Sequence, residues 1–238
     1  MSSDSAHPAD LKDRVKASYD AIATEYNDWT KDHWPLKIKH LDQMLAKLDG
    51  TTATTSATAT DPKPARRFLE LGCGAGLPVL DHLLSRDPAT TVVANDLSTT
   101  QLDLARTNLA KHGAERIEYA PGDMLALSFP DASFDGVVAL YSICHLPPRE
   151  QVAMFAKIAA WVRPGGTVLV NVVNQASGAI TADKWLAEDK ESWMYWSGLG
   201  PEQTVQVVRE SGLEVLDTVV DGGKDDFFFW IIARKQSD

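Results

Sequence analysis

Three glycines at alternate positions, directly after an apolar run, constrain this chain more than any other feature. They are Gly72, Gly74 and Gly76 in the stretch FLELGCGAGLP, residues 68–78. Glycine costs roughly 0.5–1 kcal/mol where it interrupts a regular element, so three together indicate a backbone that turns tightly or approaches another group closely. A plain turn between a strand and a helix would use them, and so would a loop that binds a cofactor.

From residue 66 onward, strand-like and helix-like segments alternate. The strand-like segments are residues 66–72, 90–96, 116–123, 134–142 and 167–173. The helix-like segments between them are residues 77–86, 97–113 and 147–166, and Ser98 stands where an N-cap is expected. Strands joined through helices form a parallel sheet covered on both faces. The pattern predicts an α/β fold with a Rossmann-like, doubly wound sheet.

The two ends of the chain differ from this pattern. Residues 213–235 hold two β-rich runs around an Asp-Gly-Gly turn, which predicts an antiparallel hairpin at the sheet edge. Residues 1–50 have apolar positions at helical spacing. The Thr/Ala-rich residues 51–65 have too little apolar mass to pack, so we predict a linker or surface loop there.

Charge and composition exclude several partners. The net charge of −10 disfavours a nucleic-acid backbone as ligand, because phosphate binding needs clustered Lys and Arg. No apolar run approaches the ~20 residues of a membrane span, and the polar start lacks the core of a signal peptide. The two cysteines, Cys73 and Cys144, form no disulfide framework. We therefore expect a cytoplasmic protein without membrane or nucleic-acid partners; the oligomeric state stays open.

Two acidic residues indicate what the glycine loop binds. Asp96 ends the second strand-like segment, where a carboxylate can accept hydrogen bonds from ribose hydroxyls, and Asp123 ends the third, within reach of an adenine amine. The glycine spacing lacks the G-x-G-x-x-G of a dinucleotide site and the Lys-Ser/Thr of a triphosphate loop. Each acid alone could be an exposed loop residue. Together they favour an adenosine pocket without a pyrophosphate cradle.

Five motifs occur in the order and spacing of one enzyme family. They are ELGCGAG, NDLS, PGDM, FDGVVALYSICHL and RPGG, within residues 66–174. The chain thereby resembles the class I S-adenosylmethionine-dependent methyltransferases, and among them the small-molecule enzymes with a methyltransferase type 11 core. The resemblance implies a seven-stranded, mostly parallel sheet with an antiparallel last strand, residues 66–238 as the cofactor-binding domain, and S-adenosylmethionine as cofactor.

The resemblance also implies roles for single residues. The three glycines pass the methionine part of the cofactor, Glu70 supports their loop, Asp96 holds the ribose, and Tyr141 offers a backbone contact to the amino group. Leu97 packs on the adenine, and Asp123 with Met124 reads its edge. Residues 18–29 resemble the family's lid segment, which makes residues 1–50 a helical lid. Tyr19 and Tyr26 are candidates to close over the cofactor, although packing on the core explains them equally well.

The residues directly after the fourth strand narrow the choice of acceptor. The stretch YSICHLPP, residues 141–148, carries no acid of a metal-dependent enzyme and no motif of nucleic-acid amino methylation, and the double-glutamate loop of protein arginine methyltransferases is also missing. We expect metal-independent, in-line transfer to a small organic acceptor, such as a secondary metabolite, on oxygen, nitrogen, sulfur or carbon. A non-methylating reaction such as a cyclisation, or a non-catalytic binding protein, remains as an alternative.

One histidine and several tryptophans are candidates for the acceptor side. His145 can act as a base near neutral pH, although a packing role is the simpler interpretation. An aromatic-rich insertion around residues 175–200 suits the wall of a planar or apolar acceptor site, and the same residues could merely cover the sheet edge. The predicted acceptor residues are Trp29, Trp34, His145, Trp185, Trp193 and Trp196.

Overall fold

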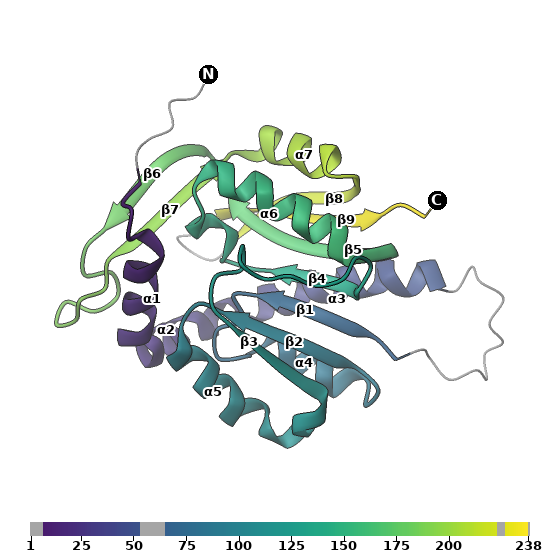
Figure 1. Ribbon diagram of the computed structural model, residues 1–238, viewed down its shortest axis with the longest axis horizontal. Helices are drawn as coiled ribbons and strands as arrows, with labels where there is room; N and C mark the ends of the chain where they lie inside the picture. The colour runs from purple at the N-terminus through teal and green to yellow at the C-terminus, as the bar shows by residue number, and fades with distance from the viewer. Residues whose placement is uncertain (1–6, 53–64, 223–226, 238) are drawn as a thin grey trace.

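The computed structural model describes residues 7–52, 65–222 and 227–237, and it places a twisted sheet between two layers of helices (Figure 1). The strand order is β3-β2-β1-β4-β5-β9-β8. The strands are β1 (Arg67–Leu71), β2 (Thr91–Asp96), β3 (Ile117–Pro121), β4 (Phe134–Ala139), β5 (Val162–Val173), β8 (Leu213–Gly222) and β9 (Phe227–Lys235). Since β9 runs antiparallel to β5 and to β8, the predicted seven-stranded sheet and its antiparallel last strand are confirmed.

Apolar helix faces cover the sheet on both sides. The helices are α1 (Leu11–Ala21), α2 (Ala23–Trp29), α3 (Trp34–Thr52), α4 (Val79–Arg86), α5 (Thr99–Leu109), α6 (Pro148–Trp161) and α7 (Pro201–Glu210). Leucines of α3, α4 and α5 pack on one face, in a cluster with Phe68 and Trp230. Residues of α6 and α7 pack on the other face around Phe134 and Leu69. No helix in the described ranges has both the length and the apolar character that a membrane span requires.

Local sequence explains where the helices begin. The Ser98 side chain accepts a hydrogen bond from the Gln101 N–H at 3.1 Å, so it caps α5 as predicted. Helices α6 and α7 each have a proline in their first turn, where the missing N–H costs nothing. Helix α5 therefore begins at Thr99, close behind Asp96 at the end of β2.

A second, two-stranded sheet lies beside the main one. It consists of β6 (Ala176–Ala182) and β7 (Met194–Leu199), which pair antiparallel, and it occupies the segment predicted as an aromatic-rich insertion. The sequence did not reveal these strands, because β6 is largely exposed and lacks apolar alternation. In Figure 1 this hairpin lies on the same side of the molecule as α1 and α2.

From Leu11 to residue 50 the chain forms helices, as expected, and α3 continues to Thr52. The predicted linker, residues 51–65, falls mostly on residues 53–64, which lie outside the described residues. Its assignment remains a prediction.

Candidate functional site

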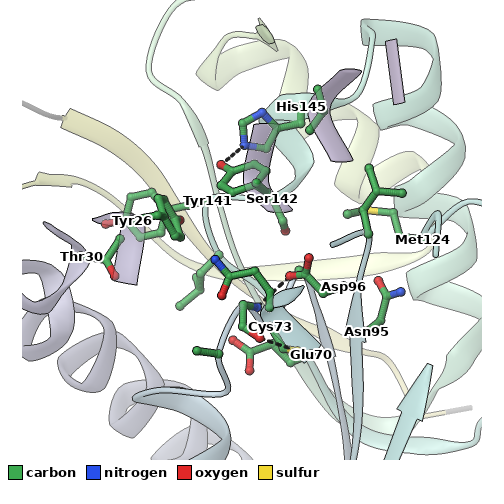
Figure 2. A pocket seen from close by; sticks show the side chains of 18 of the residues that line it. Tyr26, Thr30, Glu70, Cys73, Asn95, Asp96, Met124, Tyr141, Ser142 and His145 are labelled. Atoms are coloured by element: carbon green, nitrogen blue, oxygen red, sulfur yellow. Dashed lines mark hydrogen bonds between the residues drawn. The ribbon is translucent and has the colours of Figure 1, made fainter. Parts of the chain in front are cut away.

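A pocket lies where the strands β1 to β4 end, and α1, α2 and α3 form its other wall. Glu70, Asp96, Tyr141 and His145 border it (Figure 2). The pocket therefore brings together residues that are widely separated in the sequence. The pocket is lined by all but one of the predicted cofactor residues: Tyr19, Tyr26, Glu70, Gly72, Gly74, Asp96, Leu97, Asp123, Met124 and Tyr141. The exception is Gly76, which faces Leu109 and Ala105 of α5 instead.

The glycine loop has a conformation that explains its alternate glycines. Gly72, Gly74 and Gly76 all have positive φ angles, of 73°, 54° and 77°. A Cβ atom on Gly72 would lie 2.5 Å from the Cβ of Ser142, so the Gly72 backbone lies directly against a side chain of the loop after β4. A side chain at any of the three positions would strain the backbone, and one at Gly72 would also push the two loops apart.

Asp96 fixes the glycine loop against the end of β2. Its carboxylate accepts a hydrogen bond from the Gly74 N–H at 2.7 Å and another from the Ser98 N–H at 2.9 Å. Burial raises the pKa of Asp96 to about 6, against the effect of these two bonds. Each carboxylate oxygen keeps a lone pair, so Asp96 can still accept hydroxyl donors from a ligand.

Asp123 is already paired in this structure, with a lysine that the sequence did not single out. The Lys12 ammonium lies 2.7 Å from one Asp123 oxygen and 2.9 Å from a Glu150 oxygen. The other Asp123 oxygen accepts from the Leu125 N–H at 3.0 Å. Helix α1 is thus tied across the mouth of the pocket, and a ligand amine at Asp123 must share an oxygen with Lys12.

Tyr141, in the loop after β4, has a left-handed backbone conformation. Its φ is +56°, and its N–H donates to the buried Asn171 Oδ1 at 2.6 Å. The ring packs against Phe228 and Trp230. A ligand ammonium group only donates hydrogen bonds, so at Tyr141 it would meet the carbonyl oxygen.

His145 lies in 3₁₀-helix η4 (Ile143–His145) and links the N-terminal helices to the β6–β7 hairpin. Its Nδ1 lies 2.7 Å from the Tyr195 carbonyl oxygen, and its Nε2 lies 2.9 Å from the Tyr19 hydroxyl. A carbonyl only accepts, so Nδ1 carries the proton, and the Tyr19 O–H donates to Nε2. Burial lowers the pKa of His145 to about 4, well below the ordinary histidine value of 6.5. The imidazole is therefore neutral near pH 7, with its lone pair turned toward Tyr19.

The predicted acceptor tryptophans separate into two groups. Trp185 contacts Tyr19, Tyr26 and Trp29, with ring centroids 5.8–6.2 Å apart, and Trp196 lies 5.4 Å from Trp185. These residues form an aromatic cluster between α1, α2 and the hairpin. Trp193 instead lies under the Arg14 guanidinium at 3.8 Å. Of the predicted acceptor residues only His145 lines the pocket, and none of the tryptophans does.

Several pocket residues were not predicted from the sequence, and most are polar residues of helices. Asn27 donates to the Gln101 side chain at 3.1 Å, and both line the pocket. Further polar lining residues that were not predicted are Lys12, Thr30, Lys37, Asn95 and Ser142. A polar residue on an amphipathic helix is typical of an exposed face, so only the fold reveals these positions. Within the described part of the chain, no group of three or more His, Cys, Asp or Glu side chains could hold a metal ion.

Known proteins of similar sequence and shape agree with this architecture. A family model described as "Methyltransferase domain" matches residues 68–166. A ubiquinone biosynthesis O-methyltransferase of Dinoroseobacter shibae is 27% identical over 214 residues, covering 84% of this chain and 82% of the relative. The chain spans between 28% and 38% of the length of the first three curated relatives that it matches.

Two solved structures illustrate the range of this fold. The Burkholderia thailandensis 1,6-didemethyltoxoflavin-N1-methyltransferase, with its acceptor and S-adenosylhomocysteine bound, has a TM-score of 0.65 at 16% identity, covering 100% of this chain and 94% of that one. The [4+2]-cyclase SpnF has a TM-score of 0.57 at 21% identity, covering 80% of this chain and 81% of that one. Identities this low show the fold alone.

A Rossmann-like sheet with a glycine loop and a strand-ending acid defines a nucleoside-binding α/β protein. Residues 68–166 carry a methyltransferase domain, in agreement with the class I S-adenosylmethionine-dependent methyltransferase motifs found there.

Proposed function

We propose that this protein is a methyltransferase that uses S-adenosylmethionine to methylate a small organic acceptor without a metal. The observation that carries the proposal is the glycine loop held by both oxygens of Asp96 at the carboxyl ends of the strands. In open α/β sheets, ligands bind at this place. A nucleoside fits here, because Asp96 keeps lone pairs for ribose hydroxyls and the glycine backbone lets a ligand approach the loop closely.

The remaining pocket residues fit the other parts of the cofactor. Leu97, Asp123 and Met124 would hold the adenine, while Glu70, Gly72, Gly74 and the Tyr141 carbonyl would face the amino acid end. When bound, S-adenosylmethionine supplies a methyl group on a sulfonium for in-line displacement. The chain's own residues bind and orient the reactants and exclude water.

Tyr19 and His145 provide a path for a proton at the acceptor side. An acceptor O–H or N–H would give its proton to the Tyr19 oxygen, while Tyr19 passes its own proton to the Nε2 of His145. The bond from Nδ1 to the Tyr195 carbonyl keeps the imidazole in the tautomer that can accept it. His145 is thus proposed as the base and Tyr19 as the group that touches the acceptor.

Cofactor binding is the first test. The folded protein is expected to bind S-adenosylhomocysteine with a Kd in the micromolar range, about −8 kcal/mol. Isothermal titration calorimetry and thermal shift, each with and without EDTA, measure this. No heat and no shift in well-folded protein would contradict the proposal, and a loss of binding in EDTA would contradict metal independence.

A cyclase is the second candidate, because a fold neighbour is a [4+2]-cyclase. Cofactor binding alone does not separate the two functions. An acceptor screen with methyl-labelled S-adenosylmethionine does: labelled product together with S-adenosylhomocysteine supports methyl transfer. Conversion of an acceptor without label or S-adenosylhomocysteine identifies the non-methylating reaction. A non-catalytic role predicts binding without any conversion.

The pH dependence of cofactor affinity tests Asp96 directly. Since its pKa is raised to about 6, Asp96 becomes protonated as the pH falls from 7 to 5, and a neutral carboxyl accepts ribose hydroxyls less well. The affinity for S-adenosylhomocysteine should fall about tenfold across this range, as the ionised fraction does. Burial lowers the pKa of His145 to about 4, so His145 stays neutral there. Titrations of wild type and Asp96→Ala at both pH values measure the effect. If the affinity of both proteins falls by the same factor between pH 7 and pH 5, another group causes the pH dependence.

Residence in the cytoplasm and the absence of nucleic-acid partners belong to the same proposal. Support comes from the net charge of −10 and the small-molecule pocket.

A further inference from the structure

An aspartate near the end of α1 is bound to the amino end of α5. One Asp20 oxygen accepts a hydrogen bond from the Ser98 hydroxyl at 2.6 Å and another from the Thr100 N–H at 3.1 Å. Its other oxygen lies 2.5 Å from the Lys16 ammonium, one turn earlier on α1. Burial alone would raise the pKa of Asp20, but the bonds from these donors hold it below the ordinary value, so the carboxyl is ionised near pH 7.

Helix α1 itself is not stabilised by a carboxylate at this position. Asp20 is the last residue but one of α1, at the end where the helix dipole favours positive charge. Alanine is also a better helix former than aspartate. The amino end of α5, in contrast, favours a negative charge and offers N–H donors that have no partner inside the helix. The contact with α5 is therefore what a carboxylate at this position stabilises.

The contact joins two parts of the proposed site. Ser98 donates its backbone N–H to Asp96, the proposed ribose ligand, at 2.9 Å, and its hydroxyl to Asp20. The residue before Asp20 on α1 is Tyr19, whose hydroxyl lies 2.9 Å from the Nε2 of His145. Neighbouring residues of a helix point in different directions, so Asp20 contacts α5 while Tyr19 faces His145.

We propose that Asp20 is a positioning residue for methyl transfer: by binding the amino end of α5, it holds the Tyr19 hydroxyl at hydrogen-bond distance from His145. This inference rests on the proposed function, in which Tyr19 touches the acceptor. The proton path is sensitive to the position of α1, because a misplacement of about 1 Å can cost about 10²-fold in rate. Asp20 thus ties the acceptor-side tyrosine to the strand end that carries the proposed ribose ligand.

Rates and affinities separate positioning from binding. Asp20→Ala should slow single-turnover methyl transfer, with cofactor and acceptor saturating, at least about tenfold, and should keep the Kd for S-adenosylhomocysteine within about threefold. Asp20→Asn should stay within about threefold of the wild-type rate, because its amide oxygen still accepts from Ser98 and Thr100. Asp13→Ala is the matched control, because Asp13 is exposed on the same helix.

A double-mutant cycle with Tyr19→Phe tests whether Asp20 acts through Tyr19. In the Tyr19→Phe background, Asp20→Ala should change the rate by less than about twofold, because the hydroxyl that Asp20 positions is already gone. Rate losses that multiply would show that Asp20 supports the site in general, and would contradict the inference. A wild-type rate in folded Asp20→Ala would contradict it as well.

A spectroscopic measurement makes the test independent of an acceptor. The ¹⁵N chemical shift of His145 Nε2 reports the bond from the Tyr19 hydroxyl, and the variant His145→Gln assigns the signal. The shift in Asp20→Ala should approach that in Tyr19→Phe, and an unchanged shift overturns the inference.

Two further results complete the test. Should Asp20→Ala fail to fold, Asp20→Glu moves the carboxylate by one methylene and should shift the same signal; no change in Asp20→Glu overturns the inference. If the His145 signal moves as expected while wild type yields no labelled product in the acceptor screen, the proposed function fails and the positioning of Tyr19 by Asp20 stands.

Discussion

Methyl transfer by His145→Gln is expected to be about 10²–10⁴-fold slower than by wild type, while affinity for S-adenosylhomocysteine stays within about twofold. Glutamine can accept from the Tyr19 hydroxyl and donate to the Tyr195 carbonyl, as His145 does. It cannot take up a proton. The variant therefore removes a base and keeps the links between α1 and the hairpin, and single-turnover rates with an acceptor found by screening measure the difference.

The controls for this prediction are Tyr19→Phe and His145→Ala. Tyr19→Phe breaks the proton path at its other end and should slow transfer to a similar degree. A His145→Gln variant with the wild-type rate of methyl transfer and the wild-type melting temperature would show that His145 is not a base. If only His145→Ala is slow, and its melting temperature falls too, His145 is a positioning residue. An acceptor that arrives as an anion needs no base, and wild type and variant would then share one pH–rate profile.

Asp96→Ala should bind S-adenosylhomocysteine about 10–150-fold more weakly, which corresponds to about 1.5–3 kcal/mol for charge-assisted hydrogen bonds. The variant loses the proposed ribose acceptor. It also leaves the Gly74 and Ser98 N–H groups without their acceptor, so the glycine loop is no longer held against β2.

Asp103→Ala is the matched control, because this carboxylate is 75% exposed on α5 and pairs only locally with Arg106. Calorimetry at pH 7.5 on both variants, with melting temperatures alongside, measures the prediction. Wild-type affinity in a folded Asp96→Ala protein would show that Asp96 is not the ribose ligand.

The sheet, and the grouping of Glu70, Asp96 and Asp123 in one pocket, could be predicted because their signals are local. Glycines next to a strand end, and an acid that ends a strand, can be recognised from neighbouring residues alone, without knowing where distant segments of the chain lie. The capping by Ser98 and the antiparallel pairing of β8 and β9 have local signatures too, and both are confirmed.

The other side of the pocket depends on contacts between distant segments. Tyr19 and His145 are 126 positions apart, and only the packing of α1 against the hairpin brings them together. Lys37 looks like an exposed helix residue until α3 is placed over the end of β1. The pKa of His145 could not be predicted from the sequence either, because burial sets it. Such properties belong to the assembled fold.

The small β6–β7 sheet shares no strand with the seven-stranded sheet. Trp185, in the loop between its two strands, meets the aromatic side chains of α1 and α2. The groups proposed for the nucleoside stand instead on the loops after β1, β2 and β3. Under the proposed function, acceptor choice and cofactor binding are therefore encoded in different stretches of the gene. Substitutions or exchanged segments between β5 and α7 can diversify the methylated compound while the cofactor machinery is inherited intact.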